Sequence, residues 1–236
     1  MLTGNPFAEI SATISPAIMQ IYVVVMFLLV SGGTLFDVLH KKSARYFFSN
    51  WATQTRKSGK TITTGEMFNI AAKTACVEVA TSAEFCNARR RIAHLLTMYG
   101  FLAYIITSAV MIFCYSTPSD QSPGWLPLTW HLGASMVCVG GYWFWFFIRV
   151  DVAAEGHSPF KISRADLFIL SLLASTTLAL IWSLTQASGA TTWSILWFTL
   201  YIASTTILFG SVPWSKFAHM FFKPAAALQK RVSEAD

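Results

Sequence analysis

Histidines are the side chains of this 236-residue chain best suited to hold a metal. Two of them share a setting, since His94 follows a run of three arginines, His219 follows Lys216, and each lies at one end of a long apolar run. Haem b in a bundle of membrane helices is held by two imidazoles from different helices at the same depth, because iron takes one axial ligand on each face of the ring. The matching positions therefore predict His94 and His219 as a pair of axial ligands.

The other three histidines, His40, His131 and His157, are weaker candidates. His40 lies on the same basic side and competes for one axial position. His131 begins an apolar run on the opposite side, where the chain has no second histidine to complete a pair. His157 lies in a basic connection, which is typical of a solvated residue. For His94 and His219 the competing interpretation is an interfacial histidine bonded to backbone carbonyls or lipid headgroups.

Other residue types exclude several functions. The cysteines form no C-x-x-C pair, so we expect no iron–sulfur cluster in this chain. Transporters and channels need ionisable groups at mid-membrane depth. The second to fifth apolar runs carry no Asp, Glu, Lys or Arg except Lys216 near the end of the last, which makes a small-solute transporter a weak alternative. The tryptophans in and beside the third run, Trp125, Trp130, Trp143 and Trp145, are typical of an interfacial aromatic belt.

Composition predicts the elements that position these histidines. Only 12% of the residues are charged and 54% are hydrophobic, whereas soluble domains carry about a quarter charged residues. Continuous apolar runs cover residues 17–39, 92–115, 126–148, 167–186 and 193–222, and about 20 apolar residues suffice for a membrane-spanning helix. We therefore expect an all-α integral membrane bundle of five transmembrane helices, forming a single membrane domain over 1–236. This excludes a disordered chain, a nucleic-acid-binding domain and an ordinary soluble enzyme.

The basic residues predict the orientation. All 17 lysines and arginines lie in the 40–91 connection, in the connection between the third and fourth runs, or from residue 216 onward. Lys and Arg accumulate in cytoplasmic loops, so we expect the N-terminus outside, the C-terminus in the cytoplasm and a cytoplasmic basic loop over 40–91. The predicted location is the cell inner (cytoplasmic) membrane, with any soluble partner on the cytoplasmic side.

Two motifs resemble those of a known family. The ending Val212-Pro-Trp-Ser-Lys-Phe-Ala-His-Met-Phe-Phe-Lys-Pro224 is similar to the close of the last span in the respiratory nitrate reductase gamma-subunit family of membrane cytochromes b. The segment Phe85-Cys-Asn-Ala-Arg-Arg-Arg-Ile-Ala-His-Leu-Leu-Thr-Met-Tyr-Gly-Phe101 resembles the entry into its second span. The likeness is closest to the membrane part of the quinone-interacting membrane-bound oxidoreductase C subunit of sulfur-metabolising organisms.

The resemblance implies that His94 and His219 ligate a haem b on the cytoplasmic side. Arg90, Arg91 and Lys216 lie beside these ligands, where they would pair with haem propionates or dock an acidic partner. The competing interpretation of the three cations is ordinary charge that sets the membrane topology.

The chain also departs from the family pattern. Two-haem members have a further pair of histidines for an outer haem, and here Tyr104 and Tyr201 stand at those places. We therefore expect one haem b and no outer haem. The chain begins almost directly with its first span, without the iron–sulfur domain of the C subunit, so a separate soluble protein is expected to deliver electrons.

Free-standing proteins of this shape resemble the membrane anchor associated with adenylylsulfate reductase. The expected function is that of a non-catalytic electron-transfer subunit between a cytoplasmic iron–sulfur/flavin oxidoreductase and the quinone pool. The alternative is a haem-free anchor that only tethers the soluble subunits through its basic inner face.

Overall fold

The computed structural model describes residues 2–40, 65, 69, 72, 80–82, 87–149, 162 and 166–212. Within these ranges all regular structure is helical. Two predicted site residues, His219 and Lys216, and most of the 40–91 connection lie outside the described residues.

Among the described residues, five helices are long and apolar enough to cross a membrane, as the sequence predicted. They are α2 (Pro16–His40), α5 (Ala88–Cys114), α6 (Trp125–Trp143), α8 (Leu167–Ala187) and α9 (Thr191–Gly210). A π-helical turn, η2 (Phe144–Ile148), continues α6. The part of the chain that the structure describes is thus all-helical, as predicted, and the five helices support a multi-pass membrane protein.

Two helix ends differ from the predicted spans. Helix α5 starts before the arginines rather than after them, because the side chain of Asn87 caps it: Oδ1 accepts hydrogen bonds from the backbone nitrogens of Arg89 at 2.9 Å and Arg90 at 3.5 Å. Helix α9 ends at Gly210, whereas the predicted span extended to residue 222. Pro213 follows closely, and a proline has no N–H with which to continue the helical hydrogen bonds.

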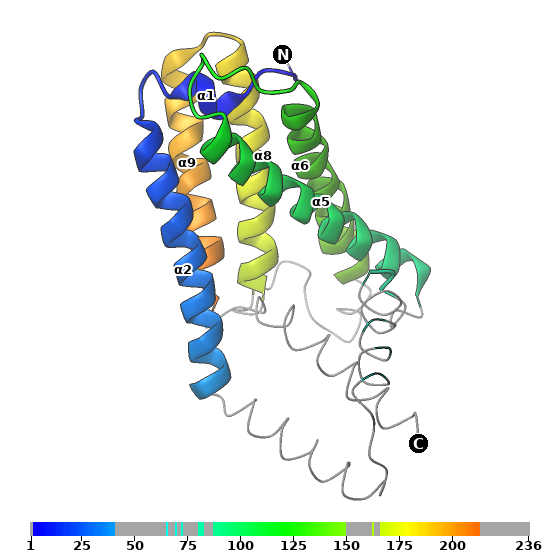
Figure 1. The fold of residues 1–236 in the computed structure, drawn as a ribbon. Helices are drawn as coiled ribbons and strands as arrows, with labels where there is room; N and C mark the ends of the chain where they lie inside the picture. The colour runs from blue at the N-terminus through cyan, green and yellow to red at the C-terminus, as the bar shows by residue number, and fades with distance from the viewer. Residues whose placement is uncertain are drawn as a thin grey trace, which may run out of the picture.

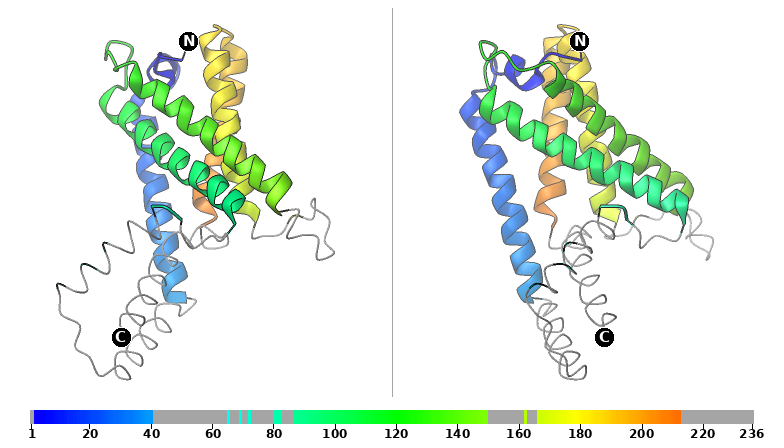
Figure 2. Two further views of the ribbon diagram at one scale, coloured as in Figure 1. Left: turned by 90° about the vertical axis from the view of Figure 1, so that its right-hand side faces the viewer. Right: turned by 45° about the vertical axis from the view of Figure 1, so that its right-hand side comes forward.

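The helices form two pairs and a separate first span. Helices α5 and α6 pack along each other and are tilted against the α8–α9 pair, while α2 stands beside α9 (Figures 1 and 2). We call the end that carries α1 (Pro6–Ile10) the α1 end, and the opposite end, where α5 begins, the His94 end. Helix α2 is joined to α9 by Tyr22, whose hydroxyl donates to the carbonyl oxygen of Ile202 at 3.2 Å.

Glycines let α5 and α6 approach backbone to backbone. A Cβ atom on Gly133 of α6 would lie 2.8 Å from the carbonyl oxygen of Gly100 and 2.8 Å from the backbone nitrogen of Tyr104. One on Gly140 would lie 2.7 Å from the carbonyl oxygen of Ala93. Small residues commonly permit such contacts between membrane helices, so this packing fixes the register of the two helices.

The short helix α1 covers the α1 end of the bundle. Its side chains Phe7 and Ile10 are buried, at 2% and 4% exposure. Polar contacts hold it there: the side-chain amide of Asn5 donates to the carbonyl oxygen of Tyr115 at 2.8 Å, and that of Gln186 donates to the carbonyl oxygen of Pro6 at 3.0 Å. The N-terminal segment, which the sequence placed outside the spans, is therefore part of the core.

Replacing Gly133 by alanine should destabilise the bundle, because the new methyl group meets backbone atoms that cannot rotate away. We expect Gly133→Ala to lower the free energy of unfolding by about 1–3 kcal/mol, measured by unfolding in detergent micelles. The matched control is Gly32→Ala in α2, since a Cβ there meets nothing within 4 Å. Equal stability of the two variants would show that the α5–α6 contact tolerates a wider spacing.

Candidate functional site

His94 lies in the second turn of α5, at the His94 end. The residue before it, Ala93, is buried at 1% exposure and packs against Gly140 of α6, which fixes the backbone that carries the imidazole. The His94 side chain is half-buried, and its Nδ1 lies 2.9 Å from the hydroxyl oxygen of Ser82. Ser82 precedes α5 in the chain and is itself buried at 2% exposure.

The hydrogen bond between the Ser82 hydroxyl and Nδ1 determines which ring nitrogen of His94 could bind a metal. Because the hydroxyl occupies Nδ1, a metal would have to be held through Nε2 of this imidazole. Metal-ligating histidines almost always use their second nitrogen in such a hydrogen bond, which fixes the tautomer and the orientation of the ring. The hydrogen bond at Nδ1 therefore fits a histidine that would hold a metal through Nε2.

The arginines beside His94 differ from one another. The Nε of Arg91 donates to the carbonyl oxygen of Thr81 at 2.7 Å, so this side chain holds the segment that carries Ser82. Arg90 is half-buried and Arg89 is exposed. The structure thus brings His94, Arg90 and Arg91 together at one end of α5, and it gives Arg91 a structural contact that the sequence did not indicate.

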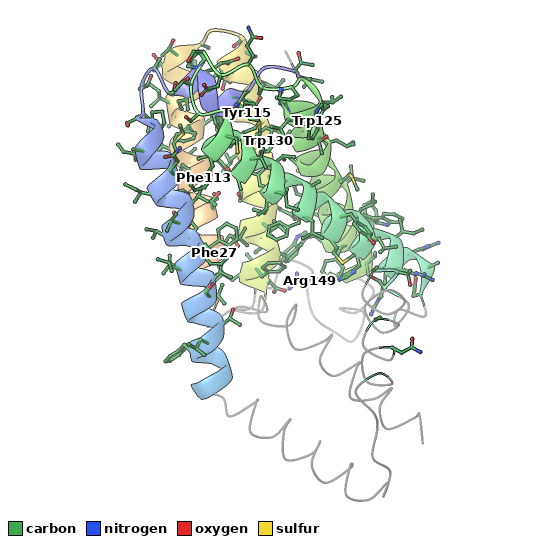
Figure 3. The ribbon with its side chains drawn as sticks, viewed as in Figure 1. Phe27, Phe113, Tyr115, Trp125, Trp130 and Arg149 are labelled. Atoms are coloured by element: carbon green, nitrogen blue, oxygen red, sulfur yellow. The ribbon has the colours of Figure 1, made fainter. Side chains whose placement is uncertain are left out.

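An ion pair joins two helices at the same end of the bundle. The guanidinium of Arg149, directly after η2, donates to the carboxylate of Asp166 at 2.6 Å and lies 4.0 Å from the ring centroid of Trp145. Both charged side chains are largely buried. Because Arg149 ends the α6–η2 run and Asp166 precedes α8, the pair joins two helices near the His94 end (Figure 3).

His131 is buried toward the α1 end, and both of its ring nitrogens have partners. Nδ1 donates to the carbonyl oxygen of Pro127 at 2.7 Å, since a carbonyl can only accept. Nε2 must then accept, and the hydroxyl of Ser183 on α8 donates to it at 2.8 Å. His131 therefore joins α6 to α8, a role that the sequence did not indicate.

Tyr104 and Tyr201 belong to one buried aromatic cluster, which also contains Phe7, Trp130, Trp182 and Phe198. Tyr104 packs against Trp130 with centroids 5.4 Å apart, and Tyr201 stacks on Trp182 at 5.7 Å and 11°. Phe7 of α1 contacts both tryptophans. Trp130 was expected in an interfacial belt, but it is fully buried, and its indole nitrogen donates to Ser108 at 2.8 Å (Figure 3). A hydrogen-bond partner inside the bundle makes this burial possible.

The hydroxyl of Tyr104 is a buried polar atom of this cluster. It forms no hydrogen bond, although it lies close to the side chains of Tyr201 and Ser175. Ser175 instead bonds with Thr205 at 2.8 Å, which joins α8 to α9.

Removing the Ser183 hydroxyl should leave the Nε2 of His131 without its donor. We expect Ser183→Ala to destabilise the bundle by about 0.5–1.5 kcal/mol, the size of an interhelical hydrogen bond in a membrane, measured by unfolding in micelles. Ser188→Ala is the control, because that exposed serine bonds only within its own turn, to the carbonyl oxygen of Thr185. If both variants unfold alike, the His131–Ser183 contact does not stabilise the α6–α8 interface.

Comparison with known proteins does not identify a family. No protein-family model, no curated protein and no solved structure matches this chain. The resemblance to the nitrate reductase gamma-subunit family therefore stays a prediction, and the function is proposed from the geometry at His94.

Proposed function

We propose that this chain is the membrane electron-transfer subunit of a quinone-linked oxidoreductase and carries one haem b at its cytoplasmic end, between His94 and His219. Haem b, when bound, takes up and releases single electrons. The cytoplasmic partner is an iron–sulfur/flavin oxidoreductase, proposed to be adenylylsulfate reductase, and the electron acceptor in the membrane is quinone.

The observation that carries the proposal is the hydrogen bond between Ser82 and the Nδ1 of His94. Such a partner supports a role as metal ligand, because the orientation of the ring and its basicity both depend on the second nitrogen. Arg90 lies one turn before His94 on the same face of α5, where its cation would pair with a haem propionate.

The aromatic cluster supports a single haem. The resemblance assigns Tyr104 and Tyr201 to the positions of the outer haem ligands. Both tyrosines are buried, at 3% and 6% exposure, and their rings pack directly against Trp130 and Trp182. A bulky planar cofactor between Tyr104 and Tyr201 would require the displacement of these rings. The packing therefore favours a protein core at this position over a second haem.

Quinone is the oxidant in the proposed reaction, and the electrons released by the soluble partner equal those that quinone takes up. AMP and sulfite form adenylylsulfate in the soluble partner and release two electrons. Quinone takes up these two electrons and two protons to form quinol. The membrane chain moves only electrons, one at a time, and its basic end attracts an acidic partner surface.

The first test is a dithionite-reduced minus oxidised visible spectrum of the purified protein, with haem counted per chain. We expect one b-type haem, lost in His94→Ala and in His219→Ala because each removes an axial ligand. His157→Ala is the matched control and should keep the haem.

Other outcomes of the same spectrum separate the alternatives. Two haems per chain would contradict the assignment of Tyr104 and Tyr201. Folded protein without haem, produced with an adequate haem supply, would favour the haem-free anchor.

Electron transfer is tested in vesicles that contain the protein and a quinone, to which adenylylsulfate reductase, AMP and sulfite are added. We expect quinol to form with the wild-type chain and to fall to the level of empty vesicles with His94→Ala. Partner binding, measured by co-sedimentation with the vesicles, should be the same for both. Equal quinol formation by the two proteins would indicate a tether rather than an electron carrier.

A further inference from the structure

Tyr142 and Thr177 form a pair of hydroxyl groups at the seam between α6 and α8. Their oxygens lie 2.9 Å apart, and Tyr142 is 37% exposed. Tyr142 follows Gly140 by two residues, and Gly140 packs on Ala93, the neighbour of His94. Both helices are apolar enough to cross a membrane, so the phenol would face the bilayer at nearly the depth of His94. No water is present there to bond with it.

Thr177 differs from other threonines of these spans in its hydrogen bonds. Most of their hydroxyls donate to the carbonyl oxygen four residues earlier, as do those of Thr97, Thr107, Thr129, Thr176, Thr185, Thr199, Thr205 and Thr206. Among the described residues, the Thr177 hydroxyl contacts only the phenol oxygen of Tyr142 and, at 3.6 Å, the Sγ of Cys138. Its proton is therefore available to one of these two atoms.

The thiol of Cys138 has another partner. Thr176 donates its own proton to the carbonyl oxygen of Leu172 at 3.0 Å, so the thiol donates to the Thr176 oxygen at 3.4 Å. Sulfur is a weak acceptor, whereas a phenol oxygen both accepts and donates. When Thr177 donates to Tyr142, the phenol proton is left for an acceptor outside the protein.

The ring of Tyr142 adds a flat surface beside this donor. It is stacked with Phe146, with centroids 6.1 Å apart and 14° between the planes, and Phe146 is 49% exposed. Planar rings pack favourably on such aromatic surfaces in an offset arrangement. A ligand that fits here must dissolve in the bilayer, have a planar ring and present a carbonyl oxygen. A quinone headgroup has all three properties.

We infer that a quinone headgroup binds at the seam between α6 and α8. One of its carbonyl oxygens accepts a hydrogen bond from the phenol of Tyr142, and its ring lies against Tyr142 and Phe146. This inference rests on the proposed function, in which quinone accepts the electrons. The seam and the proposed haem end would then share one layer of the membrane.

Tyr22 of α2 is the matched control, because it also pairs with a threonine. Its hydroxyl lies 3.0 Å from the Oγ1 of Thr206 and 3.2 Å from the carbonyl oxygen of Ile202. Thr206 donates its proton to the same carbonyl at 2.8 Å, so both neighbours of the Tyr22 hydroxyl can only accept. Here the phenol proton is already used within the protein.

The test is photolabelling of the protein in nanodiscs of an ether-linked phosphatidylcholine, which has no ester carbonyls. The probe is a short-chain azido-ubiquinone at low concentration, displaced by decylubiquinone. We expect the label within residues 138–146. In Tyr142→Phe the decylubiquinone concentration that halves labelling should rise about 3–10-fold, the effect of losing one hydrogen bond. In Tyr22→Phe it should not change.

An unchanged half-displacement concentration in Tyr142→Phe, or label confined to other helices, would overturn the inference. Nanodiscs of an ester-linked lipid test the competing occupant. Label that appears only in the ether-linked lipid would assign the seam to lipid carbonyls and would also overturn it.

Photolabelling does not require haem, so the inference and the proposed function can fail separately. Protein without haem that is labelled at the seam, with the expected Tyr142→Phe effect, would uphold the quinone site and overturn the proposed haem. Protein with a haem lost in His94→Ala, but without label at the seam, would overturn the quinone site alone.

Discussion

The backbone contact between α5 and α6 determines the position of the candidate site. Gly133 and Gly140 remove the side chains that would separate the two helices, so carbonyl groups of α5 lie against α6. Gly140 packs on Ala93, the residue next to His94, and α6 then continues through η2 to the Arg149–Asp166 pair. The imidazole thus projects from a part of α5 that packing already holds in place, as a metal ligand requires.

Many polar side chains within the bundle donate to carbonyl oxygens of their own helix, and several bond to side chains of another helix. In lipid no water is present to accept or donate, so an unpaired group is costly. Pairs such as His131 with Ser183 and Ser175 with Thr205 therefore specify which helices are neighbours. Gln186 shows the same principle at the α1 end, where it bonds to Pro6, Trp182 and Ser194 and so joins α1, α8 and α9.

The two ends of the bundle differ in chemistry. The α1 end is filled by six aromatic rings and covered by α1, which leaves a tightly packed apolar core. The His94 end carries cations, an ion pair and a histidine held by a buried hydroxyl. This difference between the two ends is why the single haem is proposed at the His94 end.

The sequence alone predicted the five spans, because continuous apolar runs of about 20 residues have few alternatives to membrane helices. It also singled out His94, from its place beside the arginines at the end of a span. It could not predict Ser82 as its partner, since the contact depends on a left-handed backbone and on long-range hydrogen bonds from Arg91 and Tyr99. Nor could it predict that Trp130 is buried rather than interfacial. That depends on which face of α6 meets α5, and the glycine contact between the helices decides it only in three dimensions.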